Sequence, residues 1–460
     1  MRPWPILAAA AVLSCATPAF AENTFEMAPP MNLVDAVSYA LNHNPVIAQK
    51  RAAVGQALYA LGQERVIAFP TVNGTLQSIL QKNANYGGAY QIIGLTPQQQ
   101  FSQNTAEIGT NYTLTTGGYA FLQLTATRAK LAAAQQDLAN SEDQIATNVT
   151  NAYYMVVQNQ AIVIVDQSDL HYQDVLVEAA KVKEHAGVAA GVDVLRAQVA
   201  QAKSASTLVG AKASVDDSRE SLAQTIGAPL DTKFFFPQVI ANPALPNEPV
   251  DRLEQIAMST RPDIGFARET LVAARATRTS WDRELFPQVQ IGAAFGNQNS
   301  PTAEQFNPTT GQPLPHEGTP GFWTLSATST FTLPLVDYGE RHFQRVNDDA
   351  QVSSAEVALE QATSQAQLDV RQSYRSAQTA LAQKSYASDE ARLGTESARI
   401  AQLQYEHGLI ALTDVLQTQQ QSVVAQNDYV DAQIAYVNAV VKLRVSLGIY
   451  DARSAVADLR

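Results

Sequence analysis

The residues best suited to chemistry stand in two matching stretches of the sequence. The segment KEHAGVAAGVDVLRAQ, which begins at Lys183, parallels YEHGLIALTDVLQTQ, which begins at Tyr405. Each has a histidine close to a glycine, and an aspartate six residues after that glycine. Histidine is a common metal ligand, but a solvated histidine in a turn is far more common than a metal site. We therefore expect no metal at His185 or His407.

The sequence lacks the motifs of enzymes. It has no phosphate-binding loop, no G-x-G-x-x-G, no nucleophile elbow and no His-x-x-x-His zinc helix, and no pair of acids stands in a catalytic setting. We expect neither catalysis nor a cofactor. The net charge of −12, with no basic stripe interleaved with aromatic residues, also argues against nucleic acid as a partner.

The first residues predict export from the cytoplasm. MRPWPILAAAAVLSCATPAFA has an early arginine, an apolar run and an Ala-Phe-Ala cleavage site before Glu22. Cleavage there would remove Cys15, the only cysteine, and leave a chain that cannot form a disulfide. In the alternative, residues 12–15 are a lipobox with a lipidated Cys15, although Leu13 suits that motif poorly. No apolar run of about 20 residues follows, so we expect no membrane-spanning helix.

The matching stretches belong to a duplication of the whole chain. NHNPVIAQKRAAVGQ, from Asn42, parallels MSTRPDIGFARETLV, from Met258, and the glycines of one half recur at the same spacing in the other. We predict a signal peptide at residues 1–21, a first repeat at 22–248 and a second repeat at 249–460. Each repeat would contain a helix, a β-hairpin and a long helical hairpin. The hairpins are expected at 72–114 and 119–226 in the first repeat, and at 289–333 and 339–447 in the second.

Polar and apolar residues alternate in the predicted β-hairpins. VQIGAAFGN, from Val289, and TLSATSTFTL, from Thr324, both place apolar side chains at every second position. About ten residues of such alternation are typical of a transmembrane β-strand, with one face toward lipid and the other toward water. Trp323 would lie in an aromatic belt. Two hairpins of a soluble β-sandwich are the alternative.

The helical segments are unusually long. Apolar residues recur every seven positions in series such as Leu131, Leu138, Ile145 and Ala152. Sustained heptads predict helices packed knobs-into-holes. The segment Tyr119–Ala186 would span roughly 100 Å, too long for an ordinary globular core, and suits a ring in which each helix has two neighbours. A shorter helix is expected from Leu33 to Val66, with Asn32 as its N-cap.

Four strands cannot close a membrane barrel, because the smallest such barrels have about eight. Open strand edges in hydrocarbon would leave backbone groups unpaired at several kcal/mol each. Two copies would give a barrel filled by side chains, whereas three would supply enough strands for a lumen. The sequence therefore predicts a mostly α-helical fold with a β-barrel part, in which three chains share one barrel and continue it as a tube of helices.

With these features the chain resembles the TolC-like outer-membrane efflux proteins. The resemblance covers nearly the whole mature chain. It rests on the duplicated plan, on LPLVDYGER (Leu333–Arg341) where a strand enters a long helix, and on the two glycines followed by Asp-Val-Leu. It implies a homotrimer with a twelve-stranded barrel in the outer membrane and an α-helical barrel in the periplasm. It also implies a passive exit duct that docks a periplasmic adaptor (a membrane fusion protein) and an inner-membrane pump.

The two glycines would be the turns at the periplasmic tips of the helical hairpins, where a reversing helix end favours glycine. The resemblance further implies that these tips dock the adaptor. In this sequence that role would fall to Gly187 and Val188 at the first tip, and to Gly408 and Leu409 at the second.

The resemblance also implies a gate near the tips. Asp414 matches an aspartate that rings the narrowed pore, and Asp193 matches an aspartate that bonds a tip tyrosine, here Tyr405. Gln417 replaces a second pore aspartate and Ile410 replaces a latching arginine, which should weaken the closed state. Three Asp414 carboxylates would repel one another and attract a divalent cation. In the alternative, Asp193 and Asp414 are ordinary acids in the first turn of a helix.

Two functions remain open at this point. The first is the trimeric exit duct of an efflux or type I secretion system, and the second is a periplasmic coiled-coil scaffold without a pore. The alternating strands favour the duct. The sequence does not decide whether the exported substrate is a drug, a metal, another small molecule or a protein.

Overall fold

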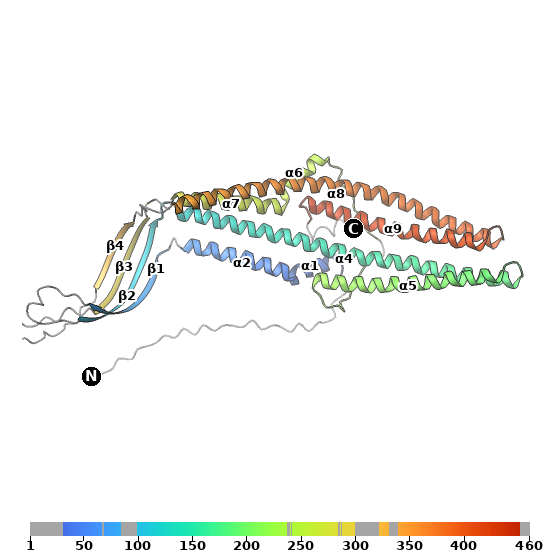
Figure 1. The fold of residues 1–460 in the computed structure, drawn as a ribbon, viewed down its shortest axis with the longest axis horizontal. Helices are drawn as coiled ribbons and strands as arrows, with labels where there is room; N and C mark the ends of the chain where they lie inside the picture. The colour runs from blue at the N-terminus through green and yellow to red at the C-terminus, as the bar shows by residue number, and fades with distance from the viewer. Residues whose placement is uncertain are drawn as a thin grey trace, which may run out of the picture.

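The computed structural model describes residues 31–66, 69–83, 99–236, 240, 242–283, 286, 288–299, 322–330 and 339–450. The predicted signal peptide and Cys15 lie outside these residues, as do positions 333–338 of the strand-to-helix junction. The molecule is long and narrow, with a β-sheet at one end and the turns of two helical hairpins at the other (Figure 1).

Four long helices form the main body of the molecule. One antiparallel hairpin consists of α4 (Tyr119–His185) and α5 (Gly191–Ile226), and the other of α8 (Glu340–Glu406) and α9 (Leu412–Ser446) (Figure 1). Because α4 also packs against α9, the helices lie in the order α5, α4, α9, α8. The long helical hairpins of the predicted fold are confirmed, and α5 and α8 form the two outer edges of the row.

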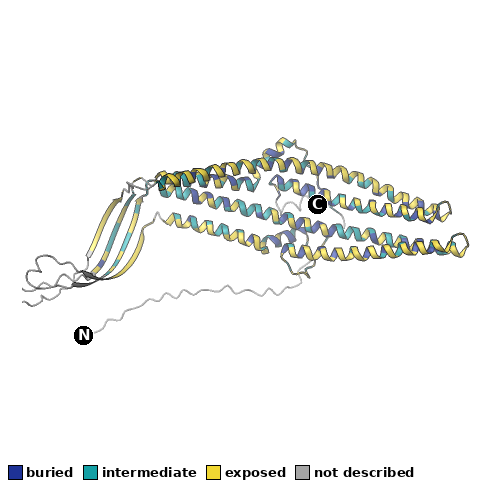
Figure 2. Ribbon diagram, viewed as in Figure 1, coloured by how far each residue is buried: buried dark blue, intermediate teal, exposed yellow. Residues whose placement is uncertain are grey.

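Hydrophobic clusters hold the helices together at successive levels. Near the middle of the molecule, α1 (Leu33–His43) packs against α4 and α5, in a cluster that also includes residues of α9; Val149, Val156 and Val437 are fully buried in it. Figure 2 shows buried residues where the helices face one another and exposed residues along the outside and on the sheet. Small side chains such as Ala126 permit this close approach of long helices.

Two short helices stand where one was expected. The N-cap prediction is correct, because the Asn32 side chain accepts a hydrogen bond in a capping box at the start of α1. The helix then ends at Asn44, and α2 (Pro45–Val66) begins. Asn44 has φ −68° and ψ 128°, since the ring of a following proline disfavours the helical conformation. The expectation of one helix from Leu33 to Val66 is therefore wrong.

The second half of the chain contains the same break. Helix α6 (Val250–Thr260) ends at Arg261, which has an extended backbone because Pro262 follows it, and α7 (Pro262–Arg283) continues. The order of elements thus matches in the two halves. The domain boundary between residues 248 and 249 stays a prediction.

The four strands form one antiparallel sheet in the order β1-β2-β3-β4. Their bounds are Thr71–Asn83 for β1, Gln99–Thr115 for β2, Gln288–Asn299 for β3 and Phe322–Thr330 for β4. Pairing of β2 with β3 joins the two halves of the chain. Backbone pairing between β1 and β2 continues through polar residues, as far as Lys82 opposite Gln100 and beyond.

The register separates the alternating side chains onto two faces. Ile108 lies opposite Phe295, and Phe295 lies opposite Trp323, so the three share one face, where they are 64%, 68% and 76% exposed. We call it the apolar face; it also carries Val72, Leu76, Ile291 and Leu325. The opposite, polar face carries Asn73, Thr75, Asn111, Thr324 and Ser326. The predicted alternation is thus present, and the apolar face has the character of a surface that contacts lipid.

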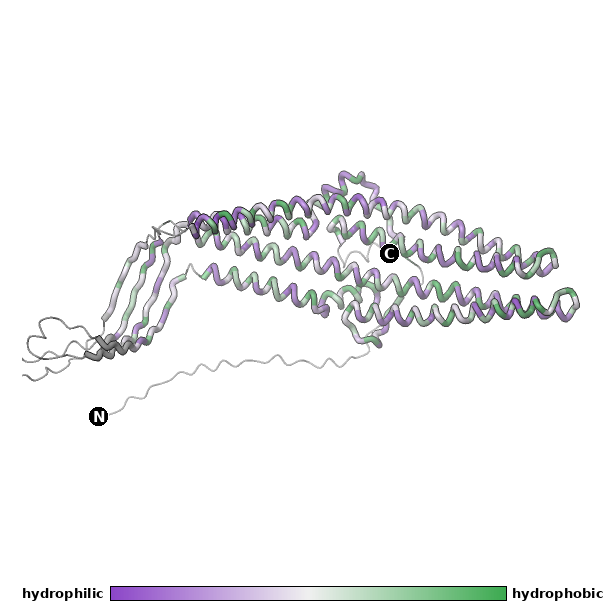
Figure 3. The backbone as a smooth tube through the Cα atoms, viewed as in Figure 1, coloured by the Kyte–Doolittle hydropathy of each residue, from purple (hydrophilic) through white to green (hydrophobic). Residues whose placement is uncertain are grey.

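The long helices have a different pattern. Polar and apolar residues are interspersed along each of them (Figure 3). In the described parts of the chain, no helix has an apolar stretch of the length that a bilayer crossing requires.

Candidate functional site: the helical tips

The two hairpins turn through the same backbone arrangement. At the first tip, the N–H of Val188 donates to the carbonyl of Lys183, and the N–H of Gly187 donates to the carbonyl of Glu184, at 3.0 and 2.9 Å. The second tip repeats both bonds around Gly408. This pair of bonds is a Schellman motif, which satisfies the last carbonyls of a helix and requires a left-handed residue. The two glycines meet that requirement with φ +72° and +74°.

The four residues expected to dock an adaptor belong to the turns between α4 and α5 and between α8 and α9, and these turns lie at one end of the molecule (Figure 1). Val188 follows Gly187 and is 75% exposed, and Leu409 follows Gly408 and is 73% exposed. No other part of the described chain comes within 4 Å of the position that a Cβ would take at either glycine. Each tip therefore presents a bare turn with one apolar side chain to its surroundings. Docking itself stays a prediction.

Behind these turns the two hairpins share a buried core. The tip cluster consists of Leu176, Val177, Ala180, Val194, Ala197, Tyr405, Leu412 and Val415. Tyr405 is only 5% exposed, and it brings the end of α8 into contact with residues of the first hairpin. Ile410 packs at the margin of the cluster, so this chain has an apolar contact where the resemblance implies a latching arginine.

Lys183 links the two tips directly. Its ammonium lies 4.1 Å from the centroid of the Tyr405 ring, and it also donates a hydrogen bond to the backbone carbonyl of Tyr405. A cation over an aromatic face is attracted by the electron-rich ring. Lys183 was not singled out from the sequence. The signal that could have found it is a basic residue in the last turn of a helix, where free carbonyls are close.

Asp193 lies near Tyr405 without bonding to it. Burial and the Asp193 carboxylate both raise the pKa of the Tyr405 hydroxyl. That hydroxyl has no hydrogen-bond partner among the described residues, and the Asp193 carboxylate instead accepts a bond of 3.3 Å from Arg196. One chain thus brings two of the three expected gate residues close together. The hydrogen bond between them that the resemblance implies is absent from this part of the structure.

Asp414, the third expected gate residue, stands in the first turn of α9 and is exposed. Its backbone carbonyl accepts a hydrogen bond from the Thr418 hydroxyl, and no residue in the described ranges bonds to its carboxylate. The carboxylate is therefore available to face either solvent or neighbouring copies of the chain. The gate role of these three residues stays a prediction.

His185 makes an ordinary helix-end contact. The His185 ring lies 2.7 Å from the carbonyl of Lys181, one turn earlier on the same helix. Within the residues that the structure describes, no three His, Cys, Asp or Glu side chains are grouped so that they could hold a metal ion.

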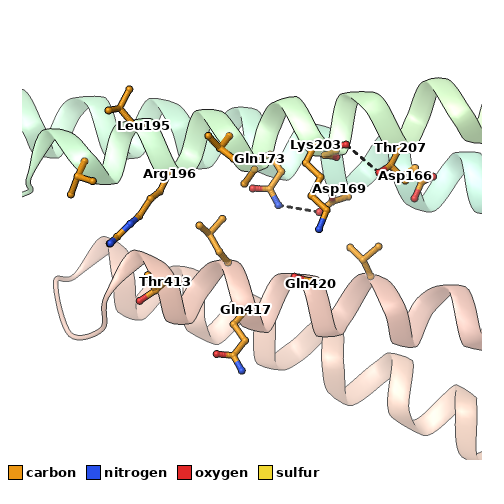
Figure 4. Close-up of a pocket in the computed structure, with 16 residues that line it drawn as sticks. Asp166, Asp169, Gln173, Leu195, Arg196, Lys203, Thr207, Thr413, Gln417 and Gln420 are labelled. Atoms are coloured by element: carbon orange, nitrogen blue, oxygen red, sulfur yellow. Dashed lines mark hydrogen bonds between the residues drawn. The ribbon is translucent and has the colours of Figure 1, made fainter.

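A cavity of about 680 Å³ opens next to the tip cluster, between α4, α5 and α9 (Figure 4). Leu195 and Val199 from α5 lie at its open side, where both stay largely exposed, while α4 contributes Asp169 and other polar residues. The Asp169 carboxylate accepts a hydrogen bond of 2.9 Å from Gln419, which ties α4 to α9. The helices are thus joined here by a polar layer and not by close apolar packing.

This polar layer is incompletely paired. Asp166 is 3% exposed, yet its Oδ2 has no hydrogen-bond partner among the described residues. Burial raises the pKa of the Asp166 carboxyl, and the nearby Asp169 carboxylate raises it further. Gln173 and Ser204 line the same cavity, and each has one buried side-chain oxygen without a hydrogen-bond partner among the described residues. An ionised carboxylate in such a position costs free energy, so the layer is a weak point in the packing of α4 against α9.

Comparisons with known proteins identify the family to which the chain belongs. The sequence profile described as outer membrane efflux protein matches residues 36–228 and 253–449, which is most of the chain. The comparison with curated proteins gives no match.

Solved structures with a similar fold include three outer-membrane proteins. The channel OprN is 18% identical, with 91% of this chain and 90% of that chain covered and a TM-score of 0.75. The outer-membrane channel CmeC from Campylobacter jejuni is 16% identical, with coverage of 93% and 89% and a TM-score of 0.75. The outer membrane protein VceC from Vibrio cholerae is 20% identical, with coverage of 90% and 96% and a TM-score of 0.74.

Proposed function

Because this chain belongs to the outer membrane efflux protein family, we propose that three copies of it form one channel that serves as the passive exit duct of an export system. The protein is an outer-membrane channel with its helical part in the periplasm.

The edges of the sheet are the observation that carries the proposal. β1 and β4 are its outer strands, so in the described part of the chain each presents one edge of backbone groups to no other strand. Unpaired backbone groups in lipid cost several kcal/mol each. Pairing of β4 in one copy with β1 in the next satisfies both edges. Three copies then close a barrel of twelve strands, which is wide enough for a lumen.

The edges of the helical row support the same closure. Leu195 and Val199 of α5 are 61% and 69% exposed, and Ile400 and Leu403 of α8 are each 42% exposed. The first pair lies just after one tip and the second pair just before the other, so both are at the same level of the molecule. Exposed apolar rows of this kind mark contact surfaces. In a ring, α5 of one copy lies against α8 of the next and both rows become buried.

The assembled channel would work as follows. The apolar face of the sheet contacts lipid and the polar face lines the lumen. At the opposite end, Val188 and Leu409 contact a periplasmic adaptor, and an inner-membrane pump supplies the energy. Gly187 and Gly408 hold the turns that present these two side chains. Asp414, together with Asp193 and Tyr405, narrows the pore until the partners engage.

Cross-linking of the helical edges tests the ring. Leu195→Cys and Leu403→Cys are introduced into the same chain and joined by a bismaleimide in intact outer membranes. Within one chain α4 and α9 separate these positions, so a link between them must join two copies. We expect most of the protein to run as a covalent trimer under denaturing conditions.

The single-cysteine variants are the matched controls, because each lacks one of the two edges. They should remain monomeric after the same treatment. A double variant that stays monomeric in the membrane, or that gives an open ladder of ever larger products, would contradict the closed trimer. A monomer in the soluble periplasmic fraction would instead favour a scaffold without a pore.

A further inference from the structure

Glu107, on β2, is the only charged residue among the strand residues whose side chains the structure describes. Glu107 pairs with Thr75 on one side and with Gly296 on the other, and these are positions of the polar face.

The surroundings of Glu107, which is half-buried, place no opposite charge beside it in the part of the sheet that the structure describes. Gly109 is the next residue of β2 on the same face, and a Cβ added there would lie 3.3 Å from Glu107 Oε1. The carboxylate therefore extends along the strand above a glycine. Gly296 is its neighbour across β3, so no bulky side chain covers it from that strand. No described residue forms an ion pair with Glu107, and its charge borders the space in front of the polar face.

We propose that Glu107 makes the barrel end of the channel selective for cations. The inference rests on the proposed trimer, in which the polar face lines the lumen and threefold symmetry repeats the carboxylate as a ring. Rings of carboxylates select cations in other channels because they lower the energy of a cation in the pore and raise that of an anion. Solutes that are neutral or positively charged would then pass this end more readily than anions.

The strength of this effect depends on salt. Charges are screened over about 10 Å at 0.1 M, about 30 Å at 0.01 M and about 3 Å at 1 M ionic strength. A ring on the wall of a wide barrel therefore controls ions across the lumen in dilute salt and loses control in concentrated salt. The start of α9, which carries Asp414, lies at the opposite end of the molecule from the sheet (Figure 1). Dilution of the salt on one side of the membrane therefore acts mainly on one of the two carboxylates.

The test measures reversal potentials of the purified trimer in planar bilayers, with KCl diluted on the barrel side. We expect the parent channel to prefer K⁺ over Cl⁻ at about 0.01–0.1 M, and Glu107→Gln to lower that preference by at least about twofold. Glu107→Lys should reverse it. All three proteins should converge at about 1 M salt. Asp414→Asn should alter selectivity when the dilute solution is on the tip side.

Glu248→Gln is the matched control, because it removes the same charge from an exposed residue just before α6, away from the sheet. It should behave like the parent. Pores of Glu107→Gln with unchanged selectivity in dilute salt overturn the role of Glu107 and leave the channel intact. A parent protein that forms no pores, and no covalent trimer in the cross-linking experiment, overturns the proposed function itself.

Discussion

The ammonium of Lys183, at the end of α4, lies 4.1 Å from the centre of the Tyr405 ring, at the end of α8. These residues are 222 positions apart in the sequence, and their contact joins the tip of one helical hairpin to the tip of the other. Tyr405 is also part of the tip cluster, so the cation lies over a ring that is held in place by apolar neighbours. The first hairpin therefore contacts the second, through Lys183, at the point where the pore is expected to open.

Loss of the Lys183 ammonium should loosen the tips. Lys183→Met keeps most of the apolar stem but removes the charge, and a cation–π contact is worth about 1–2 kcal/mol when it is partly desolvated. We expect the equilibrium ratio of closed to open channels to fall roughly 5- to 30-fold. Single-channel recordings in bilayers measure this as a higher open probability. Lys181→Met is the control, since Lys181 pairs only with Glu178 on its own helix among the described residues; an equal effect of both changes would refute a specific role for Lys183.

Replacement of Asp414 should abolish block by divalent cations. Three exposed carboxylates around a narrow pore would bind such a cation together, because their mutual repulsion is relieved when it binds. Asp414→Asn should weaken block by Mg²⁺ or Ca²⁺ by about tenfold or more in current recordings. Gln417→Ala, one turn further along α9, should leave it unchanged. If divalent cations block the Asp414→Asn channel as strongly as they block the parent, Asp414 does not line the pore.

A charge at either tip should disrupt docking. Burial of an apolar side chain of this size stabilises a complex by about 1.5–3 kcal/mol, so Val188→Asp or Leu409→Asp should weaken binding of the adaptor by at least about tenfold. Both side chains are about three-quarters exposed, so the fold should be unaffected. Surface plasmon resonance with the purified adaptor measures the loss. Leu230→Asp, at a residue that is 61% exposed beyond the end of α5, should bind normally; equal weakening there would show that the tips are not the docking site.

The raised pKa of Asp166 predicts how stability depends on pH. The folded protein binds this proton more tightly than the unfolded chain does, so the stability that it contributes is present in acid and is lost as pH rises through the raised pKa. Asp166→Asn cannot ionise, and at pH 7 it should be more stable than the parent by about 1 kcal/mol. The difference should disappear below about pH 4, the ordinary range of an aspartate.

Thermal unfolding followed by circular dichroism at several pH values measures this difference. Asp428→Asn, at an exposed position of α9, is the control and should match the parent throughout. An Asp166→Asn protein that is less stable than the parent at pH 7 would show that the carboxylate is held by partners which outweigh its burial.

The features that could be predicted from the sequence are those set by residues close together along the chain. Glycine in a left-handed turn, a seven-residue apolar period and a two-residue alternation all reflect local physics, and the hairpins and sheet faces follow from them. The break at Asn44 was missed although Pro45 was visible, because the helical periodicity continues across it. The bond between Lys183 and Tyr405 was missed because nothing local connects the two positions.

The site was harder to predict than the fold for a further reason. A single chain shows that Asp193 approaches Tyr405 and that Asp414 is exposed. It cannot show Asp414 at a pore wall, because several copies would build that wall. The polar layer around Asp166 also has no sequence signature, since a buried aspartate and an exposed one look alike until the helices are packed.

The open edges of β1 and β4 have a genetic consequence. In the proposed ring every chain must pair through both β1 and β4. One copy with a damaged edge strand therefore prevents the two intact chains that assemble with it from closing the barrel. Mixed expression of sound and damaged genes would leave few intact assemblies, and such damage would be inherited as a dominant trait. Lesions at the tips would be milder, because the tips of the two sound chains could still hold a partner.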